Sequence, residues 1–181
     1  MDRIIRGANW YCNEVNQRLR IDETTLPELS REMLPYVMGG GWFGLELPAE
    51  IAALTCEMAV NGVHEDLKTR FGREPGDWTT VTYYENLLNV FPAASTGETG
   101  SASKVQMRGR VVMLKGLLNG YAQGGVKGQK STAPTRLRWS SIVLYHDILD
   151  GNTVHKFDIP NNVLVINGVN YTAEHNRIIA A

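Results

Sequence analysis

Residues 104–114 read KVQMRGRVVML, and polar and apolar side chains alternate along most of this stretch. Successive side chains of a β-strand point to opposite faces of its sheet, so the alternation predicts a strand rather than a helix. One face carries the polar positions, Lys104, Gln106, Arg108 and Arg110. The other face carries Val105, Met107, Gly109, Val111 and Met113. We expect the second face to pack on the core and the first to meet water or a partner.

The same period of two recurs in two further segments. Residues 54–60 alternate, and the side expected in the core carries Leu54, Cys56, Met58 and Val60. In residues 136–149 the core side carries Leu137, Trp139, Val143 and Tyr145. The opposite side begins with Arg136, Arg138 and Ser140 and becomes apolar at Ile142 and Leu144. We therefore expect the far half of this strand to be more deeply buried.

Turn signals separate these strands. Asp150-Gly151 supplies the positive φ angles that tight turns need, which predicts a hairpin between residues 136–149 and 154–158. Further strands are expected at residues 9–15 and 78–87. The best helical pattern covers residues 63–71, and residues 172–179 favour a closing helical turn. The sequence thus predicts a mainly β protein with one domain spanning residues 1–181.

The composition excludes several classes of function. Lys and Arg total 18 against 19 Asp and Glu, a net charge of −1, so nothing draws the whole chain to DNA or to anionic membranes. No apolar run is long enough to cross a bilayer, and the first residues are too polar for a secretory signal. Cys12 and Cys56 show no metal-type spacing, and we expect both to be buried thiols of a protein that folds in a reducing cytoplasm.

Residues 124–132, GGVKGQKST, resemble a nucleotide-binding phosphate loop but lack its spacing. That loop needs Gly, Lys and Ser or Thr to be contiguous, whereas Gln129 separates Gly128 from Lys130. Pro134 and a strand follow where the motif needs a helix whose dipole holds the phosphate. The 4 histidines lack the spacing of helix-borne metal ligands, and no motif supplies a nucleophile. We expect no enzymatic activity, no metal and no cofactor.

A basic stripe arises if residues 104–114 and 136–149 are neighbouring strands. It would contain Lys104, Arg108, Arg110, Arg136 and Arg138. With Trp139 and Tyr145 nearby, such a stripe suits a small β-barrel that binds single-stranded nucleic acid. Both aromatic side chains fall on the face opposite the arginines, however, which places them in the core. A solvated face or a contact between subunits is the favoured interpretation, and nucleic-acid binding is the alternative.

Several segments, in order over about residues 8–179, resemble the major tail tube proteins of contractile-tailed bacteriophages and the related tubes of R-type pyocins. Asn9-Trp10-Tyr11 leads into residues 25–32, TLPELSRE, which are similar to the family's Thr-Leu-Pro-x-Leu segment. Three glycines at 39–41 precede an expected strand at residues 42–47, as a glycine-rich approach does in the family.

The second half of the chain continues the resemblance. Residues 105–110, VQMRGR, are similar to the family's strand ending in Arg-Gly. Residues 166–170, INGVN, and the closing residues 174–179, EHNRII, are similar to its C-terminal segments. The chain departs from the pattern at Asn170, where Asp is usual, and at Ala180-Ala181, which replace a Gly-Leu ending.

The resemblance implies a structural subunit with a β-sandwich or barrel-like fold and one short helix, whose inner sheets join those of its neighbours into a ring-wide β-barrel. Homohexameric rings would self-assemble into a hollow tube inside a contractile sheath, and double-stranded DNA would pass through it during genome ejection. Further partners would be the sheath, baseplate, tail terminator and tape measure proteins, and no membrane. The subunit would assemble in the host cytoplasm and end in the virion tail.

On this hypothesis the polar strand faces line the lumen or bridge subunits. The candidates are Glu57, Gln106, Arg108, Arg110, Arg136 and Arg138. We expect acids to neutralise these arginines across strands, so that DNA slides past them. The N-terminal segment and the loop at residues 119–134 would contact the next ring, with candidates Gly124, Gly125, Lys127, Gly128 and Lys130. Cys12 would form a disulfide between subunits as the alternative to a buried thiol.

Overall fold

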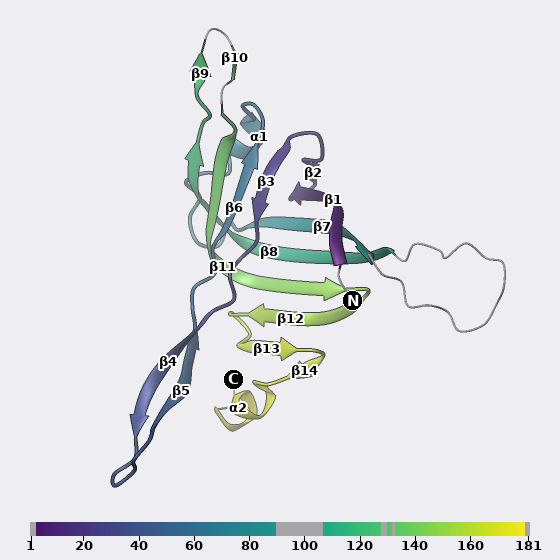
Figure 1. Cartoon of the computed structure of the whole chain (residues 1–181). Coiled ribbons are helices and arrows are strands. Elements are labelled where there is room, and N and C mark those ends of the chain that lie inside the picture. The colour runs from purple at the N-terminus through teal and green to yellow at the C-terminus, as the bar shows by residue number, and fades with distance from the viewer. Residues whose placement is uncertain (1–2, 90–106, 128–129, 132, 180–181) are drawn as a thin grey trace, which may run out of the picture.

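The computed structural model describes residues 3–89, 107–127, 130–131 and 133–179 (Figure 1). Within these residues, ten strands form one antiparallel sheet with the main order β14-β13-β12-β11-β8-β7-β1-β2, and β6 and β3 branch from β11. The strands are β1 (Arg3–Cys12), β2 (Val15–Asn16), β3 (Ile21–Thr25), β6 (Cys56–Val60), β7 (Thr79–Asn89), β8 (Met107–Ala122), β11 (Thr135–Leu149), β12 (Asn152–Asp158), β13 (Val163–Ile166) and β14 (Val169–Asn170). The prediction of a mainly β protein is confirmed.

The sheet folds over on itself because its two longest strands turn a corner. β11 pairs with β6 over its first residues and with β12 over its last. Its register with β8 is interrupted between Ser140 and Leu144, where Ser141 has a φ of 49°. Opposite the break, a Cβ on Gly116 would lie 2.9 Å from the Ser140 carbonyl oxygen, so only glycine lets the strands approach. Figure 1 shows both strands turning at this point.

The core lies between the two layers that this corner creates. β6 and the first half of β11 supply Cys56, Met58, Val60, Leu137 and Trp139 from one side. β1, β7 and the first half of β8 supply Trp10, Cys12, Val81, Val112 and Leu114 from the other. Trp10 and Trp139 meet edge to face with ring centroids 5.9 Å apart. Such a pair contributes about 0.5–1.5 kcal/mol beyond its buried area, so it fastens the layers together.

The core assignments for residues 54–60 are confirmed, with one addition. Leu54, Cys56, Met58 and Val60 are buried as predicted, although the strand itself begins at Cys56. Ala59 is buried as well. It lies opposite Glu23 on β3 and Arg136 on β11, whose longer side chains flank its methyl group.

The face predicted for residues 104–114 is wrong. Val112 and Leu114 are buried, whereas Met107 is exposed, so Arg108 and Arg110 stand on the core side of β8. Residues 111–114 are apolar on both faces, so a period of two cannot tell one from the other. The prediction for β11 is wrong only past the corner: Ile142 is buried in place of Val143, because the irregular register shifts the alternation.

Two short helices and two projecting hairpins complete the described chain. The predicted helix at 63–71 is only α1 (Glu65–Lys68), and the predicted closing turn is α2 (Ala173–Ile179). One hairpin joins β4 (Arg31–Val37) to β5 (Gly44–Ile51), and the other joins β9 (Val126–Lys127) to β10 (Lys130–Ser131). They point away from opposite ends of the molecule in Figure 1. The Asp150-Gly151 turn between β11 and β12 is confirmed, with φ angles of 50° and 80°.

Candidate assembly surfaces

Glu57, Arg136 and Arg138 share the outer face of the layer formed by β3, β6 and the first half of β11. Arg138 stands opposite Glu57 in the β6–β11 register, and its Nε lies 3.7 Å from the Glu57 carboxylate. Both side chains are more than half exposed. An ion pair with this much solvent contributes at most about 1 kcal/mol. This pair therefore fits a surface that neutralises its own charge rather than one that holds the fold together.

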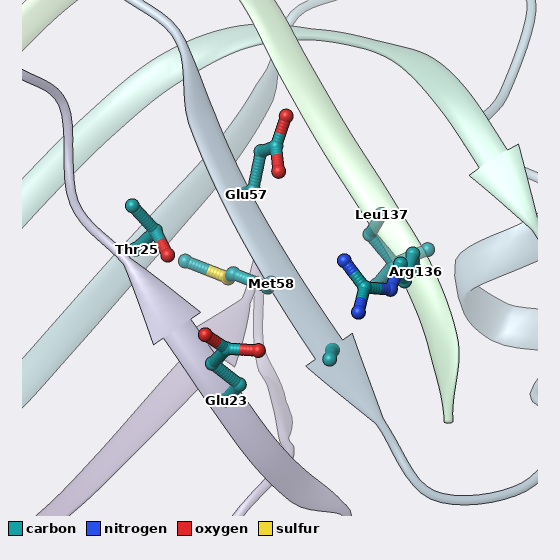
Figure 2. A pocket seen from close by; sticks show the side chains of 7 residues that line it. Glu23, Thr25, Glu57, Met58, Arg136 and Leu137 are labelled. Atoms are coloured by element: carbon teal, nitrogen blue, oxygen red, sulfur yellow. The ribbon is translucent and has the colours of Figure 1, made fainter. Parts of the chain in front are cut away.

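Arg136 lies beside the same pair. Figure 2 shows its guanidinium turned toward a shallow hollow between β11 and the carboxylates of Glu23 and Glu57 on the two neighbouring strands. The hollow has a volume of about 50 Å³, which is room for water but not for a substrate. This face therefore carries two carboxylates and two guanidinium groups side by side, in a hollow too small to bind a substrate.

Arg110 makes a very different set of contacts, within a partly buried ion cluster. Its guanidinium donates to both carboxylate oxygens of Asp147, at 2.9 and 2.8 Å, and to Glu85 at 3.2 Å. Both carboxylate side chains are at most 7% exposed. The hydrogen bonds to Asp147 raise the pKa of Arg110 above its ordinary value. Burial, followed by the charge of Asp147, raises the pKa of Tyr145 to about 12. This cluster closes one end of the core.

The proposed basic stripe does not exist among the described residues. β8 and β11 are neighbours, but they are antiparallel, so Arg110 lies opposite Leu149 and Arg136 lies opposite Ala122. With a rise of about 3.3 Å per residue, the two arginine groups lie at opposite ends of a ladder more than roughly 30 Å long. Lys104 and Gln106 are outside the described residues.

Three of the four arginines are paired with acids, as expected, and Arg136 lies beside Glu23 and Glu57. Arg108 is 3.1 Å from Asp150, and Arg110 and Arg138 have the acidic partners given above. Trp139 and Tyr145 are buried in the core, which confirms that they form no stacking platform. The single-stranded nucleic-acid hypothesis therefore loses both its stripe and its aromatic surface.

The glycine-rich loop contains a hairpin in place of a phosphate loop. Lys127 on β9 stands opposite Lys130 on β10, and Gly124 and Gly125 precede β9, while Gly128 lies outside the described residues. A Cβ on Gly124 would lie 1.9 Å from the Ala133 carbonyl oxygen, so the strands of the hairpin's stem meet only because this residue is glycine. The strand β11 follows instead of a helix, as the sequence predicted.

Both cysteines are free and buried, as predicted. Burial raises the pKa of Cys12 to about 11 and that of Cys56 to about 12, so neither forms the reactive thiolate at neutral pH. The disulfide between subunits at Cys12 stays a prediction, and it would require the edge of the core to open.

The β4–β5 hairpin exposes apolar side chains on both of its faces. Leu34 stands opposite Leu47 and Tyr36 opposite Leu45, and all four are exposed, as are Met33 and Val37 on the other face. At the tip, Trp42 is 96% and Phe43 85% exposed. A two-stranded ribbon is marginally stable alone, and so large an apolar surface marks an interaction site. The strand predicted at residues 42–47 begins two residues later, at Gly44, and its partner β4 was not predicted. The apolar run at residues 33–37, MLPYV, is the sequence signal for that partner.

The long edge of β1 is a second open surface. β7 pairs with one side of β1, from Arg3 to Cys12, whereas β2 covers the other side only at Tyr11 and Cys12. Among the described residues, no strand pairs with that side of residues 3–10. Ile4 and Ile5 on this edge are exposed. An uncovered edge of this length is a template for pairing with another chain.

An apolar hollow of about 410 Å³ lies where the β4–β5 hairpin leaves the body of the protein. Its walls come from the end of β5 and the residues that follow, from the corner of β11, and from β12 and β13. The apolar members are Ile51, Ala52, Ala53, Leu54, Ile142, Phe157, Ile159, Val163 and Leu164. Glu50, Asp158 and Asn162 add polar groups to the lining.

The described residues contain no group of three or more His, Cys, Asp or Glu side chains suited to hold a metal ion. The helices in the same part of the chain are too short and too polar to span a bilayer. The features that stand out are instead a folded-over β sheet, an open strand edge, two projecting hairpins and self-neutralised charges. Together they define a structural protein of the kind that functions by contacts with other chains.

The sequence model of the family described as Phage tail tube protein FII matches residues 2–179, and the chain belongs to this family. Its members are structural proteins of the phage tail, not enzymes. Among solved structures, the chain resembles a sheath/tube terminator of PVC, an extracellular contractile injection system. The TM-score is 0.52 at 8% identity, over 80% of this chain and 93% of that one, which shows a shared fold. A search of curated proteins found no match.

Proposed function

We propose that this tail tube protein self-assembles into hexameric rings, and that the rings stack into the hollow tube of a contractile phage tail. The observation that carries the proposal is apolar surface that the subunit does not cover: both faces of the β4–β5 hairpin and the edge of β1. A monomer gains nothing from these surfaces and risks aggregation through them. An assembly buries them.

The edge of β1 supports the contact within a ring. Residues 3–9 offer an uncovered backbone edge along most of a long strand, up to Trp10, whose carbonyl accepts from the Gln17 N–H. Pairing of this edge with a strand of the next subunit would continue the sheet from copy to copy. A head-to-tail contact of this kind closes into a ring when the rotation between subunits divides a full turn, and the inner sheets then form a ring-wide β-barrel.

The two projecting hairpins support the contact between rings. They extend from opposite ends of the subunit, so a stacked neighbour lies within reach of each (Figure 1). Gly124, Gly125 and Lys127 belong to the β9–β10 hairpin, which we propose as one ring-to-ring contact. Sheath, baseplate, tail terminator and tape measure proteins are the further partners of the finished tube.

Charge balance supports passage of double-stranded DNA. Glu57, Arg136 and Arg138 form a face whose cations lie beside carboxylates, and Arg108 is paired with Asp150. We propose that Glu57, Arg136 and Arg138 line the lumen or bridge subunits, while the paired Arg110 closes the core. A lumen without net positive charge lets DNA slide instead of binding.

Substitution of an exposed edge residue tests the ring. Ile5→Lys places a charge on the open edge of β1 without touching the core, and charged side chains on edges oppose strand pairing. We expect the wild-type chain to form rings and tubes in electron micrographs and the variant to stay monomeric with an unchanged melting temperature. Leu19→Ala, at an exposed leucine between β2 and β3, is the control. A variant that forms rings as readily as the wild type would refute this role of β1.

A further inference from the structure

The tip of the β4–β5 hairpin and the hollow at its base are complementary in chemistry. The tip presents two large aromatic side chains, Trp42 and Phe43, almost fully to solvent. Residues 38–44, MGGGWFG, carry no charge, and the three glycines keep the tip narrow. The hollow has a volume of about 410 Å³ and a mainly apolar lining. Pockets of this size and lining bury most of the surface of the group that occupies them.

One chain cannot join its own tip to its own hollow. Ile51, at the end of β5, lines the hollow, and Phe43 precedes the start of the same strand. Eight residue steps at about 3.3 Å each separate them by roughly 25 Å. Figure 1 shows the hairpin running away from β12 and β13, which form the opposite wall. A tip that fills the hollow must therefore come from another chain.

We propose that Trp42 and Phe43 of one copy dock in this hollow on the next copy along the tube. The inference rests on the proposed self-assembly and gives it a specific contact. Because the tip of each copy reaches the base of the next, the contact is head to tail and displaces each copy along the hairpin. The β1 edge takes the contact within a ring, so the docking of the tip is assigned to the contact between stacked rings.

The lining also accommodates the polar atom of the tip. A buried indole N–H needs an acceptor. The lining includes Glu50 and also Asp158, whose carboxylate already accepts hydrogen bonds from Asn161. The uncharged tip brings no anion near these acids. Ile159 lines the hollow and is still largely exposed, so it continues the apolar lining to the outer surface, where Leu45 and Leu47 of the docked hairpin would cover it.

Three variants test the docking by the concentration at which rings stack into tubes. Trp42→Ala with Phe43→Ala removes the tip, and Ala53→Arg puts a charged side chain into the hollow from an exposed position. Truncation of a central aromatic anchor weakens an interface by at least about 2 kcal/mol, so we expect stacking to need roughly 30-fold more protein. Rings should still form. Leu19→Ala, which removes an equally exposed side chain elsewhere, should stack like the wild type.

Cross-linking tests the same contact directly. Under oxidation, Phe43→Cys combined with Ala53→Cys should give a ladder of covalent oligomers, because each copy bonds to the next. The matched control pairs Phe43→Cys with Leu19→Cys, an exposed position outside the hollow, and should give no ladder. The natural cysteines are buried and do not interfere.

The outcomes separate the two proposals. If the tip variant stacks at the wild-type concentration, or if both cysteine pairs cross-link equally, the docking is refuted and the tube assignment stands. If the folded tip variant cannot form rings, the hairpin joins subunits within a ring and the docking between rings is again refuted. If the wild-type chain forms neither rings nor tubes, self-assembly fails and the docking fails with it.

Discussion

The two-layer core and the β4–β5 hairpin are built from the same kind of sequence but differ in how far their apolar side chains are buried. In both, apolar side chains recur along antiparallel strands. Those of β6 and β11 are almost entirely buried against the other layer, whereas those of β4 and β5 stay exposed on both faces. The core stabilises the subunit by itself. The hairpin, by contrast, carries apolar surface that only a second chain covers, so substitutions should separate folding from assembly.

The largest effect is expected in the core. Trp139→Ala removes one ring of the Trp10–Trp139 contact and leaves a cavity between the layers. Such a truncation costs about 3–5 kcal/mol, which is a large part of the stability of a domain. Urea denaturation should show this loss. Trp42→Ala, a truncation of the same chemistry on the hairpin, should change the free energy of unfolding by less than about 0.5 kcal/mol. Equal losses at the two sites would contradict the division between core and hairpin.

The ion cluster at the end of the core should rank next. Arg110→Met leaves Glu85 and Asp147 buried without their cation, and removal of one partner from a buried pair costs about 3 kcal/mol or more. Urea denaturation of the variant and the wild type measures this loss. Arg136→Met, on the exposed face, is the control and should be nearly neutral. A loss at Arg110→Met no larger than that at Arg136→Met would refute the stabilising role of the buried cluster.

The buried thiols should make the protein sensitive to alkali. Burial raises the pKa of Cys12 to about 11 and of Cys56 to about 12, while both ionise near their ordinary value in the unfolded chain. Their contribution is thus complete below about pH 9 and is lost as the pH rises through the folded values, by on the order of 3 kcal/mol for Cys12 and about 4 kcal/mol for Cys56. Thermal melts between pH 8 and 11 measure this loss. The slope should flatten in a Cys12→Ala, Cys56→Ala variant, and an unchanged slope would assign the loss to other groups.

The smallest effect is expected on the charged outer face. Glu57→Ala and Arg138→Ala should each change stability by less than about 1 kcal/mol, because their ion pair is exposed. In a tube, however, Glu57→Ala leaves Arg138 without its carboxylate partner and leaves Arg136 with Glu23 as its only carboxylate neighbour in the hollow. If this face lines the lumen, tubes of the variant should retain DNA at low salt and release it as salt rises. Tubes of Arg138→Ala, which lack one of these cations, should not retain DNA at low salt.

How far the sequence predicts this molecule depends on what the alternation can distinguish. Residues 54–60 and the first half of β11 have one polar side, so their buried faces were predicted correctly. Residues 111–114 are apolar on both sides, and the choice of face then depends on β7, where Glu85 stands opposite Arg110. The alternation within residues 104–114 cannot reveal that Glu85 is the partner of Arg110. The corner at Ser141 likewise buries Ile142 in place of Val143 without a local signal, although Tyr145 is buried as predicted.

The candidate surfaces show the same limit. Cross-strand pairing of the arginines followed from their charge, and it is present. The prediction that they form one stripe is wrong because β8 and β11 are antiparallel, which places the two arginine groups at opposite ends of the ladder. Sequence spacing does not reveal the direction of a strand. The sequence does not predict an exposed apolar hairpin at residues 31–51, because its apolar strands look like ordinary core strands. The structure shows that its apolar side chains are exposed among the described residues.

Cryo-electron microscopy of the purified chain over a range of concentrations tests the central claim most directly. The account predicts sixfold rings that stack into hollow tubes, with β1 paired to a neighbouring subunit and the tip of the β4–β5 hairpin enclosed by the next ring. A chain that stays monomeric at every concentration and salt, with the hairpin still bare, would contradict it.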